Sequence, residues 1–262
     1  MKKLPISDLF IMEKLKPNDV EKLEVIKDLV DQFIDLMLNY RQSGHPGGSR
    51  SKVHMFLSSL LSGYVRYDLR DPAKTFNDRI ILAAGHTIPL VYSTLAVFNE
   101  AMRLRYEETK DERYLPKKQE STLYPKDLLN FRRRGGLPGH AEMGGKTLLL
   151  KFNTGPSGHG ITASVGEAFA LKRMGLNDVK VVVFEGDAGL TPGGAHETMN
   201  SAWALGLDNL FFLIDWNNFG IDDHPLTETV PNTPNEWFDS HTWRVFGTMK
   251  GNDFPDVFEV VN

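Results

Sequence analysis

The strongest constraint on the fold lies between residues 179 and 222, where two apolar runs flank a helical pattern. The first run, 181–184, is rich in β-branched residues, which is typical of a strand buried on both faces. Pro192 and the helically spaced apolar residues after it predict a helix that ends at Gly206. The second run, 210–214, predicts the next strand. In such a strand–helix–strand unit the strands are parallel, so both carboxyl ends lie at one edge of the sheet.

Polar side chains follow both predicted strands at this edge. Asp187 comes after the first strand and Asn217 after the second. A carboxylate and an amide oxygen are hard donors of the kind that Mg²⁺ prefers, with water, a backbone carbonyl and phosphate oxygens as further ligands. Backbone N–H groups near Gly186 and at the start of the helix can bind the same phosphates. On the residues alone an ordinary alternative stays open, in which Asp187 caps a helix and Asn217 shapes a turn.

The segment GDAGLTPGGAHE, followed by Asn217 after the next strand, resembles the thiamine diphosphate motif of the transketolase family and of the related deoxyxylulose-phosphate synthases. The resemblance implies that Asp187, Asn217 and the carbonyl of Phe219 bind Mg²⁺, or another divalent cation such as Ca²⁺ or Mn²⁺, that carries the cofactor diphosphate. It also implies an apolar wall at Ile221. One departure is Ala188, which stands at the family's second motif glycine and is costly only if that position needs a positive φ.

Glycine-preceded histidines recur in the loops: His45 in SGHPGG, His86 in AGHT and His140 in PGHAE. Zinc is not expected, because the chain has no cysteine and no pair of histidines at helical HxxxH spacing. Any one of them could simply be a loop histidine bonded to backbone. The resemblance to transketolase implies instead that they line the substrate channel and contact sugar hydroxyls and the cofactor. Neutral imidazole can both donate and accept a hydrogen bond and titrates near working pH, which suits proton transfer to and from a ketose hydroxyl.

Two further segments take roles from the same resemblance. NTGPSGHGI is similar to the family segment that approaches the cofactor through its backbone, although His159 stands where the family usually has glutamine. Glu197 matches a family glutamate that links the two active sites of a dimer, and a solvated surface glutamate is the ordinary alternative. The residues that the resemblance assigns to cofactor binding are His86, Gly155, Pro156, Ser157, His159, Gly186, Asp187, Ala188, Asn217 and Ile221.

Composition narrows the class of protein. The chain has 262 residues, of which 41% are hydrophobic, so residues 1–262 can form a single α/β domain with a short N-terminal helical arm. The net charge of −4 gives no basis for binding nucleic acid or an anionic membrane. The lack of cysteine is compatible with the cytoplasm, where we expect the protein. We expect neither a signal peptide nor a membrane-spanning segment.

The rest of the chain alternates between helical and strand patterns, which predicts a mainly parallel sheet flanked by helices, the thiamine diphosphate-binding fold of the resemblance. The charged segment 103–119 predicts a solvated helix or an exposed excursion. The small residues of the helix at 161–174 permit close packing: Ala163, Ser164, Gly166 and Ala168. Further helices are expected at 20–41, 52–64, 87–102, 124–131 and 254–261, and further strands at 78–83 and 242–249.

The resemblance covers nearly the whole chain, yet only the first of the family's three domains. The carboxylate that activates the cofactor, the pyrimidine pocket and the basic residues for a sugar phosphate belong to the next domain. We therefore expect the diphosphate-binding subunit of a split transketolase, which self-associates and is completed by a partner with the pyrimidine and C-terminal domains. It would transfer a two-carbon ketol unit from a ketose to an aldose. Alternatives are a fragment of a longer enzyme, a 2-oxoacid-decarboxylating relative (a dehydrogenase first component or a deoxyxylulose-phosphate-synthase-like protein) and a non-catalytic assembly subunit.

Overall fold

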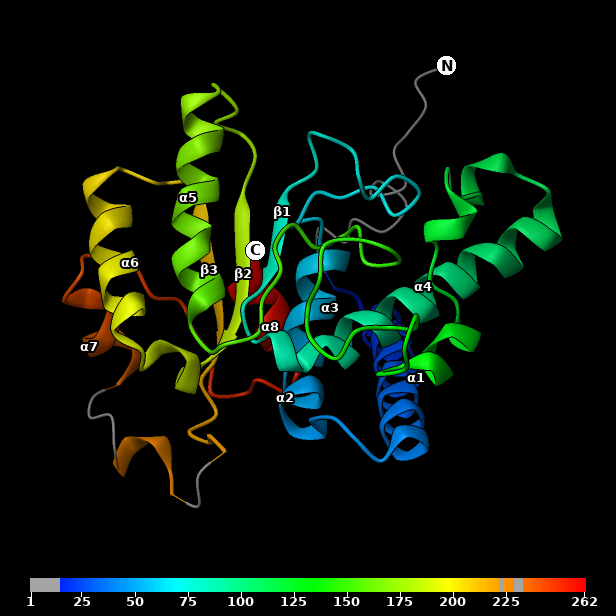
Figure 1. Cartoon of the computed structure of the whole chain (residues 1–262), viewed down its shortest axis with the longest axis horizontal. Coiled ribbons are helices and arrows are strands. Elements are labelled where there is room, and N and C mark those ends of the chain that lie inside the picture. Colours follow the sequence, from blue (N-terminus) through cyan, green and yellow to red (C-terminus); the bar gives the residue numbers. More distant parts are fainter. Residues whose placement is uncertain (1–14, 222–223, 229–232) are drawn as a thin grey trace.

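Three parallel strands form the centre of the molecule (Figure 1). The computed structural model describes residues 15–221, 224–228 and 233–262, so the predicted arm up to residue 14 lies outside the described residues. The strands stand in the order β1-β2-β3, which makes β2 central. Their bounds are β1 (Arg79–Leu82), β2 (Val181–Gly186) and β3 (Leu210–Asp215).

Helices cover both faces of this sheet, as Figure 1 shows. Val182 and Phe184 of β2 point into the larger core, whereas Val181 and Val183 point into the smaller one. All four are fully buried, so the predicted burial of this strand on both faces is confirmed. The larger core is shared with α1 (Pro17–Arg41), α3 (Val53–Leu61), α4 (Ile88–Thr109) and α8 (Phe254–Val261). The smaller core is shared with α5 (His159–Arg173) and α6 (Gly193–Ala204).

The predicted strand–helix–strand unit is present as β2, α6 and β3. Pro192 immediately precedes α6, and Gly206 follows its end with φ 59°. β2 and β3 pair in parallel, with Gly186 opposite Asp215. Their carboxyl ends are therefore level, and we call this side of the sheet the carboxyl edge. In Figure 1 it faces downward, toward α2 (Pro46–Ser51) and the first turn of α5.

The predicted strand at 242–249 is wrong, because the structure has no strand there. The Trp243 ring stacks on Phe212 of β3, with 4.6 Å between ring centroids, and its Nε1 donates to the carbonyl of Met199. Trp243 and Val245 thus pack on the core between β3 and α6 through their side chains, whereas Phe246 and Met249 are exposed. The segment does not extend the sheet by backbone pairing.

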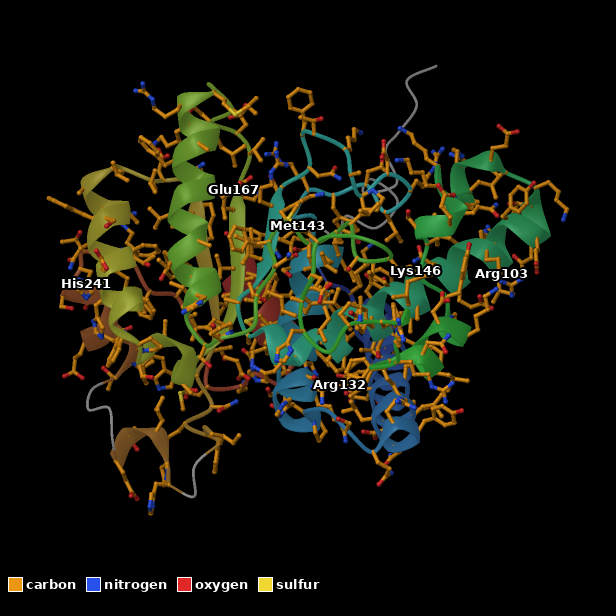
Figure 2. All side chains as sticks on the ribbon, in the orientation of Figure 1. Arg103, Arg132, Met143, Lys146, Glu167 and His241 are labelled. Atoms are coloured by element: carbon orange, nitrogen blue, oxygen red, sulfur yellow. The ribbon has the colours of Figure 1, made fainter. Side chains whose placement is uncertain are left out.

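Several helices also differ from the prediction: α3 ends at Leu61, and the segment expected to be helical at 124–131 is a 3-10 helix, Pro125–Asn130. The glycine-rich segment before Lys52 is itself helical, because Pro46 at the first position starts α2 and Lys52 only separates α2 from α3. α4 continues to Thr109, well into the charged segment. At the solvated end of this helix Arg103, labelled in Figure 2, forms ion pairs with Glu100 and Glu107, which lie three residues before it and four after it.

Two glycines of α5 differ in their surroundings: Gly160 is closely packed against the sheet, and Gly166 faces open space. A Cβ on Gly160 would lie 2.6 Å from the Cα of Ala83, beside the end of β1, whereas one on Gly166 would meet no atom within 4 Å. We expect Gly160→Ala to lower the free energy of unfolding by about 1–3 kcal/mol, since the helix must move away from the strand. Gly166→Ala, the matched control, should raise it by about 0.5–1 kcal/mol. Urea unfolding of both variants measures this, and equal stabilities would contradict the packing described.

Candidate active site at the carboxyl edge

Asp187 joins the two loops that leave β2 and β3. Its side chain is buried, with the residue 2% exposed. Oδ1 accepts from the backbone N–H of Ala188 at 2.8 Å, and Oδ2 accepts from the N–H of Asn218 at 2.6 Å. Burial raises the pKa of Asp187, and these two N–H groups partly offset the effect. Each carboxylate oxygen keeps a free lone pair, so the group can still bind a cation.

Asn217 lies in the loop that Asp187 contacts. Its Oδ1 accepts from the N–H of Phe219 at 2.9 Å, and its Nδ2 donates to Oδ2 of Asp215 at 2.9 Å. The same Asp215 oxygen accepts from Lys52 Nζ at 3.1 Å. Sequence reasoning gave no role to Lys52 or Asp215. The available signal was the position of Asp215, which ends its strand beside the Gly186-Asp187 turn.

The donors present fit a divalent cation that carries a diphosphate. Asp187 and Asn217 supply only oxygen, the donor atom that Mg²⁺ prefers. Among the described residues with positive φ, Ala188 does not occur, so its methyl group causes no backbone strain. Within the described part of the chain no three His, Cys, Asp or Glu residues form a metal-binding group. A cation here would therefore need the amide, a backbone carbonyl and oxygens from outside the protein.

Phe219 and Ile221 do not form an enclosed apolar wall in this chain. Phe219 is 73% exposed and Ile221 is 91% exposed. The carbonyl role of Phe219 does not depend on its side chain. An apolar wall at Ile221 would need another surface packed against it.

The structure brings the three predicted histidines together. The rings of His45 and His86 meet edge to face, with 5.1 Å between their centroids. Burial lowers the pKa of His86, and partial burial of the largely exposed His45 ring lowers its pKa too, with a further contribution from Arg132. The charge of His140 lowers both further. For His86 the pKa falls to about 4, with the charges of His45 and Lys52 contributing. His86 therefore does not titrate near working pH, contrary to expectation: it is neutral at pH 7, able to donate a hydrogen bond from one ring nitrogen and accept one at the other.

The low pKa of His86 predicts a loss of stability in weak acid. Between the ordinary pKa of 6.5 and the folded value of about 4, the unfolded chain binds a proton that the folded protein excludes. The free energy of unfolding contributed by this group is thus complete above pH 6.5 and falls as the pH drops toward 4. An NMR titration should give a midpoint for His86 near 4. A midpoint at 6.5 or above would contradict this environment.

The glycine-rich loop before α5 is fastened to its neighbours at the same edge. The N–H of Thr154 donates to the carbonyl of Ala141 at 2.9 Å, and its Oγ1 donates to the carbonyl of Leu82 at 2.5 Å. Gly158 has φ 79°, and a Cβ on it would lie 3.0 Å from the carbonyl oxygen of Gly189. The loop thus adjoins both His140 and the turn after β2. Its other predicted residues are half-buried (Gly155) or exposed (Pro156, Ser157 and His159).

Two glutamates contrast at this edge. Glu185 is 2% exposed, burial raises its pKa to about 7, and N–H groups of Gly186 and Gly158 act in the opposite direction. A Cβ on Gly189 would lie 2.2 Å from its Cδ, so this glycine makes room for the carboxyl group. Glu185 was missed, although a charged residue inside an apolar run signalled it. The predicted Glu197 lies exposed on α6.

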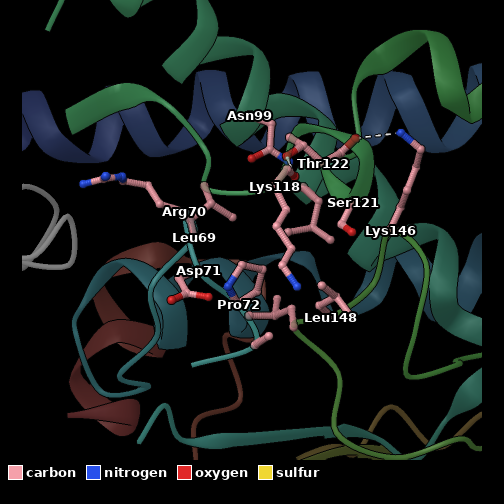
Figure 3. A pocket seen from close by; sticks show the side chains of 13 residues that line it. Leu69, Arg70, Asp71, Pro72, Asn99, Lys118, Ser121, Thr122, Lys146 and Leu148 are labelled. Atoms are coloured by element: carbon pink, nitrogen blue, oxygen red, sulfur yellow. Dashed lines mark hydrogen bonds between the residues drawn. The ribbon is translucent and has the colours of Figure 1, made fainter. Parts of the chain in front are cut away.

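Other features of the surface lie apart from these residues. A hollow lined by Leu69, Pro72, Asn99, Lys118 and Lys146, among others, contains none of the predicted site residues (Figure 3). His241, labelled in Figure 2, contacts Asn200 of α6 on the opposite side of the molecule from α4. No helix within the described residues has both the length and the apolar character needed to cross a membrane.

Comparisons with known proteins identify the family to which the chain belongs. Residues 122–262, more than half of the chain, match the family model described as transketolase, thiamine diphosphate binding domain. Transketolase 2 of Vibrio vulnificus is 30% identical over 221 residues, which cover 80% of this chain and 30% of that protein. A transketolase of Buchnera aphidicola is 27% identical over 230 residues, covering 84% of this chain and 31% of the relative.

Solved structures show the same fold. Transketolase from Campylobacter jejuni superposes with a TM-score of 0.72 at 23% identity, covering 92% of this chain and 35% of that one. The Leishmania mexicana enzyme gives 0.71 at 23% identity, covering 90% and 33%. The chain thus spans about a third of the length of the relatives it matches. It belongs to the transketolase family, and the part that it shares with the family is the thiamine diphosphate-binding domain.

Proposed function

We propose that this chain is the diphosphate-binding subunit of a split transketolase, which transfers a two-carbon ketol unit from a ketose to an aldose. The observation that carries the proposal is the meeting of two sets of residues at the carboxyl edge. Asp187 contacts the loop of Asn217 there, and His86 packs against His45. The first set suits a cation with a diphosphate, and the second suits hydroxyl groups of a sugar.

In this proposal each set has a distinct task. Asp187, Asn217 and the carbonyl of Phe219 hold Mg²⁺, or Ca²⁺ or Mn²⁺ in its place, while the backbone near Gly155 and Ala188 faces the diphosphate. When bound, thiamine diphosphate supplies a nucleophilic carbon that cleaves and forms the ketol bond. Burial keeps His86 neutral, so one ring nitrogen is free to accept a hydrogen bond or a proton from a sugar hydroxyl. The exposed His45 and His140 orient the other hydroxyl groups.

A second polypeptide would complete the site. In the family that the sequence resembles, the pyrimidine pocket belongs to the next domain. The exposed Phe219 and Ile221 flank the proposed metal site as a surface that another protein could cover. We propose that the partner carries the pyrimidine and C-terminal domains, and that two diphosphate domains associate with each other. Glu197, exposed on α6, would then link the two active sites of the assembly.

The test is reconstitution of the protein with its natural partner, Mg²⁺ and thiamine diphosphate. Ketol transfer between sugar phosphates or related sugars is the expected result. Release of CO₂ from pyruvate without ketol transfer would favour the 2-oxoacid-decarboxylating relative. The segment GDAGLTPGG also resembles sequences of that class. Assembly without cofactor binding would indicate a non-catalytic subunit and overturn the proposal.

A further inference from the structure

One carboxylate oxygen of Asp215, at the carboxyl edge, accepts three hydrogen bonds from two parts of the chain that are distant in sequence. Oδ2 of Asp215 accepts from Ser51 Oγ at 2.5 Å, from Lys52 Nζ at 3.1 Å and from Asn217 Nδ2 at 2.9 Å. Ser51 and Lys52 lie where α2 passes into α3, whereas Asp215 ends β3. The contact therefore ties the helical segment that carries His45 to the loop that carries Asn217.

This contact fixes which end of the Asn217 amide faces which neighbour. A carboxylate only accepts hydrogen bonds, so Asp215 requires the NH₂ end of the amide. The backbone N–H of Phe219 only donates, and it requires the oxygen end at 2.9 Å. Rotation of the amide by 180° would place two acceptors together on one side and two donors on the other. Asn217 thus keeps Oδ1 on the side of the 217–219 turn, with one lone pair still free.

Lys52 stabilises the Asp215 carboxylate, because its ammonium group is buried beside that carboxylate. The residue is 3% exposed, and its Nζ bonds to Asp215 and, at 3.4 Å, to the carbonyl of Gly48. It also lies 3.6 Å from where a Cβ on Gly186 would stand, just before Asp187. Without this cation, the carboxylates of Asp187 and Asp215 would stand at adjacent strand ends with no positive charge between them, which is costly in a buried site.

We propose that Lys52 is a positioning residue for the cation site: it holds Asp215, and Asp215 holds the amide of Asn217 with Oδ1 presented for the metal. This inference rests on the proposed function. Lys52 touches neither metal nor substrate in this account. Its effect reaches the metal only through Asp215, as outer contacts of metal ligands do in other proteins.

The test compares Lys52→Met with Lys151→Met in the full chain, together with its partner. Lys151 is also partly buried, and its Nζ donates to the carbonyls of Pro72 and Leu148, so it controls for loss of a lysine that only stabilises the fold. With Mn²⁺ and thiamine diphosphate as probes, we expect Lys52→Met to raise the dissociation constant for Mn²⁺ about 10–100-fold. Lys151→Met should lower the thermal unfolding midpoint and leave that constant unchanged.

A double variant separates positioning from direct contact and guards against misfolding. Lys52→Met/Asp215→Leu removes both charges, which buried ion pairs tolerate better than the loss of one partner. If Lys52 acts through Asp215, the double variant should bind Mn²⁺ no more weakly than Asp215→Leu alone. Additive losses would mean that Lys52 contacts the diphosphate itself and would overturn the inference. So would unchanged affinity in Lys52→Met, whereas a wild-type protein that binds no cation would overturn the proposed function as well.

Discussion

Asp187→Ala is expected to weaken binding of thiamine diphosphate with Mg²⁺ about a hundredfold or more. Asp187 is the one charged ligand proposed for the cation, and it is buried with its oxygens already aimed by the N–H groups of Ala188 and Asn218. Removing one partner from a buried charge pair typically costs about 3–5 kcal/mol, and each 1.4 kcal/mol is a tenfold change in affinity. Calorimetric titration of the reconstituted complex with the cofactor measures the change.

Asp208→Ala provides the matched control. Asp208 is an exposed aspartate in the loop between α6 and β3, at the end of the strands opposite to the carboxyl edge. It pairs with Lys172 of α5. Its removal should leave cofactor affinity unchanged. If Asp187→Ala bound the cofactor as tightly as this control, the proposed cation site would be wrong.

His86→Ala should reduce the rate of ketol transfer by about 10²–10⁴-fold, the usual contribution of one general acid or base. The residue combines proximity to His45 with a pKa of about 4, so nearly all of it is neutral at working pH. Since His86 is not proposed to hold the cation, affinity for Mg²⁺ should change far less than the rate. The measurement is a steady-state assay paired with calorimetry on the same preparation.

His54 supplies a control of the same chemical type. Burial lowers its pKa as well, but its ring packs on Phe254 of α8, within the larger core side of the sheet. His54→Ala should destabilise the fold and leave the rate per folded molecule nearly intact. Equal rate losses in the two variants would show that His86 acts only through stability.

The parts of the fold that the sequence predicted are those set by local patterns. The β-branched run in β2, the proline before α6 and the glycine after it each specify a short stretch of backbone, and together they place Asp187 beside the loop of Asn217. The histidines were found by the same route, because each follows a glycine in a loop. Their clustering came from the family resemblance, and the 5.1 Å contact of His45 with His86 agrees with it.

The parts that the sequence did not predict depend on contacts between distant residues. Lys52 and Asp215 are 163 residues apart, and no local pattern joins them. Trp243 was assigned to a strand because its neighbours suit one, yet stacking on Phe212 prevails over strand pairing. Of the small residues expected to allow close packing, Ser164 and Ala168 are buried, whereas Gly166 is exposed and Gly160, about 1.7 turns earlier, makes the closest contact with the sheet. Which face of a helix meets the sheet was not resolved by counting small residues.

The most direct test of the central claim is a crystal structure of the protein with Mg²⁺, thiamine diphosphate and its partner. We expect one octahedral Mg²⁺ at the carboxyl edge, with side-chain oxygens of Asp187 and Asn217 at about 2.0–2.1 Å and diphosphate oxygens among the remaining ligands. A cofactor bound elsewhere, or a metal that neither of these side chains touches, would contradict the account.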